Sequence, residues 1–321
     1  MTVWNSSNAG INIVDFTAAY VEQAAYIAKE NYEEERGVVP TLPPVDAFPN
    51  LNGFAENNLG VAAVDGTDLL GFFCWFTPWE NHFGLCKGTW SPIHAHGTVK
   101  QNRVEIYDRL YQSVAEKLVS SGVFSHAVTL YTHDTAANES FYQNGFGRRC
   151  VDAIRETVSI AAPNCTGVTF RQAEEVDAEV IAEMSNSESA HLSRSPIFMP
   201  CLTTRTTADI AKAINGNDYQ YFIAHEHNRP VAYYRIHKTG ENFACNDNTM
   251  MNICGAYALP EVRGKGVSVG LLSWLMAWLR ERGYLRCGVD FECFNFTARK
   301  FWLKYFTAYT NSVIRRIDER S

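Results

Sequence analysis

The order of residues in the first half of this chain returns in the second half at an almost constant distance. Three aromatic positions near the end of each half lie 160 residues apart: Phe141, Tyr142 and Phe146 match Phe301, Trp302 and Phe306. Three further positions lie 161 residues apart: Leu110, Tyr111 and Gly122 match Leu271, Leu272 and Gly283. Near-equal separations in different elements indicate an internal duplication. A duplicated chain is constrained to fold as two similar domains, and half of 321 residues is a typical domain length.

Both halves also share one order of predicted elements. A short strand, a polar turn and an amphipathic helix are predicted at 10–27 and again at 167–184. Two strands joined by a turn follow, at 59–76 and at 219–237. Each half then continues as a strand, a turn, a long helix, a strand and a short aromatic helix.

The junction between the two copies is a polar stretch at 161–167, just before the first strand of the second copy. Pro163, Asn164 and Gly167 interrupt regular structure there. We therefore expect one domain at 1–163 and a second at 164–321.

In the second half, a glycine-rich turn joins a hydrophobic run to a long helix. The run 251–259 ends at Pro260, and the turn contains Gly264 and Gly266. Glycines let backbone N–H groups approach an anion closely, and a helix start adds a partial positive charge at the same place. The turn is therefore predicted to bind a pyrophosphate group.

Two other phosphate-binding turns are excluded by spacing. A P-loop needs a glycine five residues before Gly264 and a Ser or Thr directly after Lys265, but the chain has Leu259 and Gly266 at those places. A Rossmann turn needs a third glycine where Val269 stands, and it normally opens the first strand–helix unit of a domain.

The sequence Arg263-x-x-Gly266-x-Ser268 resembles the R/Q-x-x-G-x-G/A acyl-CoA signature of the GNAT superfamily of N-acyltransferases, with Ser268 in place of Gly or Ala. The order of elements extends this resemblance over nearly the whole chain, and 138–146 looks like the family's late helix. The resemblance implies an α/β (α+β) fold of two tandem GNAT-like domains. Each would be a mixed, mostly antiparallel sheet flanked by helices.

The resemblance also implies that the second half binds acetyl-CoA as co-substrate. The expected acetyl-CoA-binding residues are Ala258, Leu259, Arg263, Gly264, Lys265, Gly266, Val267, Ser268 and Asn295. Asn295 follows a predicted strand, and it could contact CoA, cap the next helix, or do both.

The first half is expected to be a degenerate copy. The segment that corresponds to the phosphate turn, 98–105, has no glycine after Gly97, and Glu105 would repel a phosphate. We therefore expect one CoA per chain. His94 and His96 stand two residues apart on a predicted strand and could chelate zinc, but no third ligand is evident nearby, so no metal is expected.

Transfer to an amine needs a base for the ammonium and an acid for the leaving thiolate. Glu292, near the end of a strand, is the candidate base, acting directly or through water. Tyr257 is a candidate groove residue on the strand before the turn. Family members often have a tyrosine where this chain has Trp302, so Tyr305 and Tyr309 are the alternative acids.

Composition limits the partners and the compartment. The net charge of −7 argues against a nucleic-acid or anionic-membrane surface. The nine cysteines are scattered singly, and the first residues show no secretory signal, so a cytoplasmic protein with reduced thiols is expected. The expected acceptor is a small-molecule amine or a peptide, and a homodimer is left open.

The sequence thus predicts an N-acetyltransferase that moves an acetyl group from acetyl-CoA to a primary amine by direct attack in a ternary complex. A CoA-binding regulatory or scaffold protein without turnover is the alternative, because Trp302 replaces the usual acid. An aminoacyl or longer acyl donor also stays open.

Overall fold

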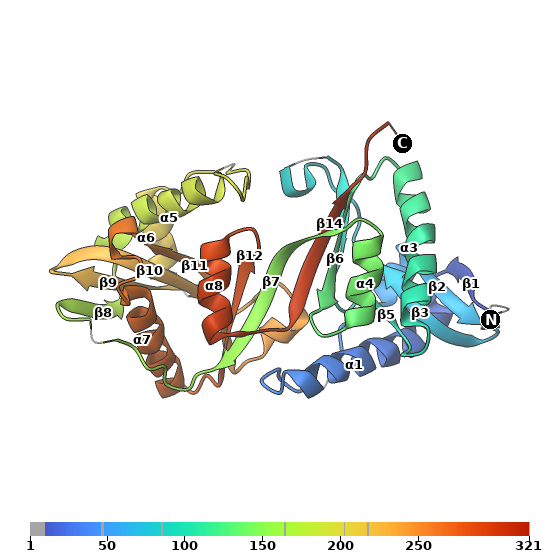
Figure 1. Cartoon of the computed structure of the whole chain (residues 1–321), viewed down its shortest axis with the longest axis horizontal. Helices are drawn as coiled ribbons and strands as arrows, with labels where there is room; N and C mark the ends of the chain where they lie inside the picture. Colours follow the sequence, from blue (N-terminus) through green and yellow to red (C-terminus); the bar gives the residue numbers. More distant parts are fainter. Residues whose placement is uncertain are drawn as a thin grey trace, which may run out of the picture. The chain divides into compact units, whose positions relative to one another are not determined.

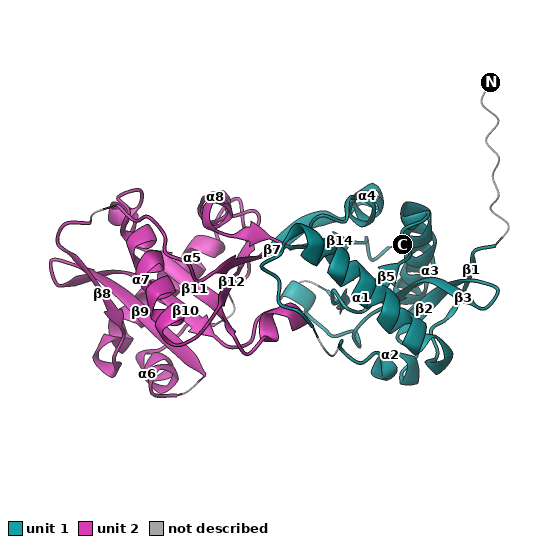
Figure 2. Cartoon of the chain, turned by 90° about the horizontal axis from the view of Figure 1, so that it is seen from below, with its two compact units in different colours: residues 1–150, 309–321 teal, residues 151–308 magenta. Residues whose placement is uncertain are grey.

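The chain forms two compact units that do not follow one cut in the sequence. The computed structural model describes residues 10–45, 48–84, 86–163, 165–201, 203–216 and 218–320. Unit 1 contains residues up to Cys150 together with 309–321, and unit 2 contains 151–308 (Figure 2).

Unit 1 begins with a strand and a helix and continues as a mostly antiparallel arrangement of strands covered by helices (Figure 1). Its sheets have the strand orders β1-β2-β3-β5 and β4-β6-β14-β7. Its elements are β1 (Asn12–Asp15), α1 (Val21–Val38), α2 (Asn52–Glu56), β2 (Gly60–Asp65), β3 (Asp68–Cys74), β4 (Gly88–Ser91), β5 (His96–Thr98), α3 (Arg103–Ser120), β6 (Ser125–Tyr131), α4 (Thr135–Gln143), the first residues of β7 (Gly147–Glu156), and β14 (Thr310–Arg316).

Unit 2 repeats this plan around the strand order β7-β12-β11-β10-β9-β8. The four strands from β8 to β11 are antiparallel, and β12 joins β11 in parallel. Its elements are β8 (Val168–Gln172), α5 (Ala178–Leu192), α6 (Thr207–Asn215), β9 (Tyr219–Glu226), β10 (Arg229–His237), β11 (Met250–Ala258), α7 (Val267–Glu281), β12 (Arg286–Glu292), α8 (Phe296–Tyr305) and β13 (Thr307–Ala308).

Each unit is completed by a strand that comes from the other half of the sequence. β14, near the chain's end, pairs with β6 along seven residues and with the beginning of β7. The rest of β7 lies beside β12 and pairs with β13. The units therefore divide at 150/151 and 308/309, whereas the composition pointed to 163/164, because a strand's sheet is decided by its pairing and not by its place in sequence.

Equivalent turns in the two units confirm that the halves share one fold. Asp134 caps α4 and Asn295 caps α8, each through a side-chain oxygen that accepts from the amide three residues later. Gly122 and Gly283 follow the long helices α3 and α7 with φ angles of 73° and 81°. The predicted duplication and the predicted mixed sheets flanked by helices are thus present.

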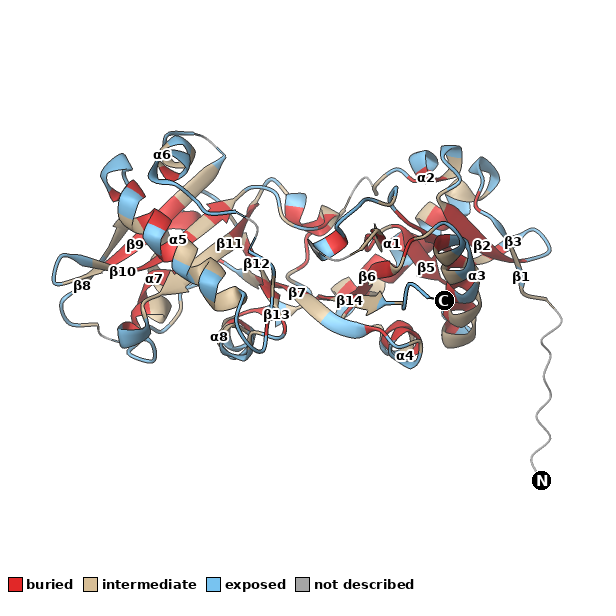
Figure 3. Ribbon diagram, turned by 90° about the horizontal axis from the view of Figure 1, so that it is seen from above, coloured by how far each residue is buried: buried red, intermediate tan, exposed pale blue. Residues whose placement is uncertain are grey.

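The strands carry the buried residues, and the outer faces of the helices are exposed (Figure 3). In unit 2, residues of one sheet face pack against α7 and α8, and residues of the other face pack against α5 and α6. Tyr107 and Tyr111 of α3 are buried, and so is Trp278 of α7. Trp274 of α7 is half-buried.

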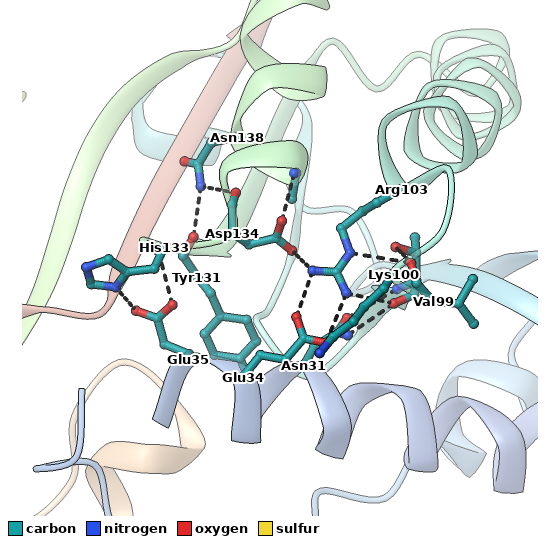
Figure 4. Close-up of polar contacts among 12 residues, drawn as sticks. Asn31, Glu34, Glu35, Val99, Lys100, Arg103, Tyr131, His133, Asp134 and Asn138 are labelled. Atoms are coloured by element: carbon teal, nitrogen blue, oxygen red, sulfur yellow. Dashed lines mark hydrogen bonds and ion pairs between the residues drawn. The ribbon is translucent and has the colours of Figure 1, made fainter. Parts of the chain in front are cut away.

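In unit 1, an arginine closes the place where unit 2 has its phosphate turn (Figure 4). Asn102 takes the left-handed conformation before α3, as Gly266 does before α7. The guanidinium of Arg103, the next residue, lies 3.0 Å from a carboxylate oxygen of Glu34 and 3.0 Å from one of Asp134. It also donates to the carbonyl of Thr98. A buried guanidinium that is already paired with two carboxylates has no capacity for a phosphate, which supports the expectation of a degenerate first copy.

We expect Arg103→Met to lower the free energy of unfolding by about 3 kcal/mol, because it leaves a buried carboxylate without its partner. Urea denaturation followed by tryptophan fluorescence would measure this loss of stability. Arg109→Met is the control on the same helix, since Arg109 is half-exposed and pairs with Glu105 one turn away. It should cost less than about 1 kcal/mol. Equal losses in the two variants would contradict the structural role of Arg103.

Candidate functional site

The strands β11 and β12 separate near the middle of the unit 2 sheet. Their pairing ends at Ile253 and Val289. The next residue of β11, Cys254, is the extra residue of a bulge in the ladder with β10. A bulge bends its strand and disrupts the ladder locally. The two strands therefore diverge beyond this point and leave an edge of β11 without a neighbouring strand.

Backbone amides of β11 point into the opening between these strands. The amide of Leu259 donates to the carbonyl of Val231 on β10, at 2.9 Å. Because successive amides of a strand alternate in direction, those of Ala256 and Ala258 point to the side that β12 has left. Ala258, a predicted ligand residue, has no acceptor for its amide among the described residues. Leu259 does, so only its side chain or carbonyl could serve a ligand.

The predicted phosphate turn lies directly beyond β11. Gly264 and Gly266 have φ angles of 75° and 89°, which L side chains rarely adopt. Gly270 is the first residue of α7 whose amide bonds back along the chain, to the carbonyl of Gly266 at 2.9 Å. The amides of Val267 and Ser268 donate to no acceptor in the described part of the chain. They point outward from the helix start, the arrangement that suits pyrophosphate.

Two neighbours of this turn were not expected. A Cβ atom on Gly266 would lie 2.3 Å from Cγ of Pro163, so the linker packs on that side of the turn. Arg263 folds back, with its Nε donating to the carbonyl of Ala258 at 2.9 Å and its guanidinium above the ring of Tyr257. Lys265 is exposed and is the basic side chain of the turn that remains for a phosphate.

The cap residue and the aromatic residues predicted for the site lie on or next to helix α8. Asn295 caps this helix by accepting from the amide of Ala298 at 3.2 Å, so its capping role is present. Trp302 is buried against Tyr234 and Phe306. Tyr305 is partly buried on the α7 and α8 side of the sheet. Tyr309, the other candidate acid, is buried and belongs to unit 1, so it is not part of this site.

Tyr257 and Glu292 lie on the opposite side of the sheet from Tyr305. Tyr257 packs with the residues of α5 and α6. Phe291 of β12 and Cys293, the residue after β12, belong to the core against α7 and α8, so Glu292 between them faces the α5 side. A base at Glu292 and an acid at Tyr305 would thus approach an acyl group in the opening from its two sides.

A group of carboxylates surrounds the end of β12. Burial, together with the negative charges of Asp152, Glu241 and Glu292, raises the pKa of Asp290 from 3.8 to about 8. Asp290 and Glu292 share one strand face. A concentration of like charge beside an opening favours a cationic ligand. Sequence reasoning placed Asp290 on this face but did not give it a role.

Glu188 of α5 was missed altogether. One of its carboxylate oxygens accepts from the hydroxyl of Tyr233 at 2.5 Å, and the other accepts from the amide of Ala256 at 3.2 Å. Burial raises the pKa of Glu188, although both hydrogen bonds and the charges of Arg235 and Arg205 oppose the rise. Glu188 lies seven positions after Ile181, in line with the buried stripe of the helix but beyond its predicted end at 184, because α5 continues to Leu192.

The histidines of unit 1 act as structural groups. His96 is buried, with Nδ1 3.0 Å from the hydroxyl of Tyr107 and Nε2 2.7 Å from the carbonyl of Thr129. Burial lowers the pKa of His94 and of His96 to about 4. Within the described ranges, no group of three His, Cys, Asp or Glu side chains is arranged to hold a metal ion.

A search of the described helices for one that is long and apolar enough to cross a membrane finds none. The family model described as "Acetyltransferase (GNAT) family" matches residues 188–306. No curated protein matches the sequence as a relative.

Several solved structures share the fold at low identity. A GCN5-related N-acetyltransferase from Sphaerobacter thermophilus is 12% identical, with a TM-score of 0.56 over 95% of both chains. A GCN5-related glucosamine N-acetyltransferase region in a fungal multi-domain GH3 β-N-acetylglucosaminidase is 12% identical, with a TM-score of 0.52. That match covers 95% of this chain and 38% of the fungal one. A GCN5-related N-acetyltransferase from Kribbella flavida covers 96% of this chain and 71% of its own, at 12% identity and a TM-score of 0.41.

The coverage of the first two structures extends over both halves, which agrees with two GNAT-like domains. The turn Arg263–Ser268 lies inside the segment that the family model matches. Residues 188–306 therefore match the GNAT acetyltransferase family, and both halves have a GNAT-like fold.

Proposed function

We propose that unit 2 transfers an acetyl group from acetyl-CoA to a primary amine within a ternary complex. The observation that carries the proposal is the opening after Ile253 and Val289, together with the amides of Ala258, Val267 and Ser268, which have no acceptor among the described residues. A pantetheine chain could follow β11 from the phosphate turn into this opening. Holding amine and thioester together removes the entropy of their encounter.

The proposed acceptor is an amine because the opening is bordered by carboxylates. Asp290 and Glu292 face the α5 side, and Asp152 is hydrogen-bonded by Asn242 at 2.9 Å nearby. An ammonium group placed among them would gain favourable charge interactions and lower the pKa of Asp290 again. These charges favour small cationic amines and do not distinguish them from the amino terminus of a peptide.

In the proposed reaction, Glu292 takes a proton from the ammonium, directly or through water. The amine nitrogen attacks the carbonyl carbon of the thioester, and a backbone amide of β11 stabilises the oxyanion. The carbon–sulfur bond then breaks. Tyr305 donates its hydroxyl proton to the departing thiolate, and the amide product and CoA leave. After the attack the nitrogen still carries one extra proton, which it releases to water, and the proton that Glu292 holds returns to Tyr305 through solvent.

The alternative is a CoA-binding protein without turnover, and one feature favours it: the buried Trp302 stands where an acid is usual in the family. Incubation with acetyl-CoA and a panel of primary amines, followed by release of free CoA, separates the two. Tight binding of acetyl-CoA with no acetylated amine would favour the alternative.

One CoA should bind per chain, as measured by isothermal titration calorimetry. Gly266→Val should abolish this binding, because the side chain would meet Pro163 and the left-handed backbone would shift. Gly283→Val is the matched control: its φ is 81° and no atom stands near its Cβ position, so it imposes similar backbone strain away from the turn. Two equivalent sites, or equal loss of binding in both variants, would contradict the proposed location.

Glu292→Gln should reduce turnover by roughly 10²-fold while acetyl-CoA affinity changes little, because the variant lacks a proton acceptor. The acidic limb of the pH–rate profile should flatten. Glu281→Gln, which alters a largely exposed carboxylate at the end of α7, should keep the wild-type rate and profile. If Glu292→Gln also keeps the wild-type rate and profile, Glu292 is not the base that takes the proton of the ammonium.

Asp290 predicts a pH dependence of stability. Its pKa is raised in the folded protein, so the folded state holds a proton that the unfolded chain releases above about pH 4. Its contribution to the free energy of unfolding should therefore fall as pH rises from about 4 to about 8. Asp290→Asn should remove this part of the decline. Parallel stability curves for wild type and variant, from urea titrations at several pH values, would show that Asp290 ionises normally.

A further inference from the structure

The carboxylate of Glu188 accepts a hydrogen bond from the backbone amide of Ala256, and the proposed reaction needs that amide. Ala256 is the first residue after the bulge whose amide points into the opening. CoA carries its phosphates at one end and its thioester at the other. With the phosphates at Gly264 and Gly266, the thioester end reaches the inner end of the opening, where β11 and β12 part. Ala256 is closer to that point than Ala258.

Glu188 is held at this position from two sides. Its second carboxylate oxygen accepts from Tyr233, whose hydroxyl lies in the interior of the α5 face. α5 packs across β10 and β11, so the side chain approaches the opening from a fixed helix. A carboxylate on a backbone amide forms a charge-assisted hydrogen bond, which is stronger than one to a neutral oxygen.

We propose that Glu188 holds the place of the acyl oxygen in the free protein and is displaced when an acyl-CoA binds. The inference rests on the proposed function. A thioester carbonyl can take the amide of Ala256 only after Glu188 has left it. Free CoA has no carbonyl at its sulfur, so it can bind while Glu188 stays in place. Glu188 therefore weakens the binding of acyl-CoA relative to CoA and brings the two affinities closer together.

The test compares the dissociation constants of CoA and acetyl-CoA, by calorimetry, in wild type and variants. The ratio of the CoA constant to the acetyl-CoA constant should rise about tenfold or more in Glu188→Ala, because acetyl-CoA no longer displaces a charge-assisted hydrogen bond. Glu188→Gln keeps the shape with a neutral, weaker acceptor, so its ratio should rise severalfold. Glu183→Ala, an exposed carboxylate on the same helix, is the control and should keep the wild-type ratio.

Hydrogen exchange of the Ala256 amide gives an independent readout. The amide should be protected in free wild type, exchange faster in free Glu188→Ala, and regain protection in that variant when acetyl-CoA is added. If Glu188→Ala does not fold, the ratio and the exchange rate in Glu188→Gln decide the question.

The results separate this inference from the proposed function. Wild type that binds neither CoA nor acetyl-CoA would refute the proposed function, and amide exchange in the free protein would then still test the contact. Normal binding of both ligands, with the same ratio in Glu188→Ala, Glu188→Gln and wild type, would overturn the role of Glu188. Equal exchange of Ala256 in free wild type and Glu188→Ala would overturn it as well.

Discussion

The proposed site in unit 2 depends on the point where the pairing between β11 and β12 ends. A parallel ladder that continued past Ile253 would have consumed the amides of Ala256 and Ala258 in hydrogen bonds to β12. The bulge at Cys254 turns β11 away, and the freed edge becomes a row of donors. Buried backbone donors need partners, so this edge must be satisfied by a side chain, water or a ligand. Glu188 satisfies one donor, and the proposed acyl-CoA would use the others.

Unit 1 meets the same requirement with its own side chains. Its long helix α3 also starts after a left-handed residue, Asn102, but the following residue is Arg103 instead of a small one. The guanidinium binds Glu34 and Asp134 and the carbonyl of Thr98, so the polar groups at this helix start are satisfied within the chain. Beside it, Glu35 is buried and bonds His133 through Nδ1 at 2.7 Å. One backbone plan thus supports the proposed ligand site in unit 2 and a closed polar network in unit 1.

In unit 2, the two ends of the opening carry opposite charge. Helix-start amides and Lys265 offer positive charge at the turn, where phosphates would lie. Glu292 and Asp152 supply negative charge at the end of β12 and the adjoining part of β7, beside Asp290, whose pKa is raised to about 8 by burial and by these charges. An anionic donor and a cationic acceptor would then each be attracted to a different end.

Sequence alone determined the features that depend on local residues. Glycine is needed where φ is positive, so the turn at Gly264 and Gly266 was readable, and so was the cap at Asn295, whose side chain bonds a residue three positions away. The repeat at 160–161 residues disclosed the two-fold plan, and helical periodicity located α3 and α7. Each of these features is recognised from residues within one turn or one helix, or from the similarity of two segments of the sequence.

Tertiary structure decided what depends on residues that are distant in sequence. The pairing of β14 with β6 joins residues that lie almost two hundred positions apart, and no local pattern specifies that partner. The contact of Glu188 with Ala256 needs the bulge, the alternation of amides and the placement of α5 together. The raised pKa of Asp290 comes first from its burial and then from nearby carboxylates, of which Asp152 and Glu241 belong to other segments of the chain. Such features arise from packing, because burial and charge interactions depend on distance in space and not along the chain.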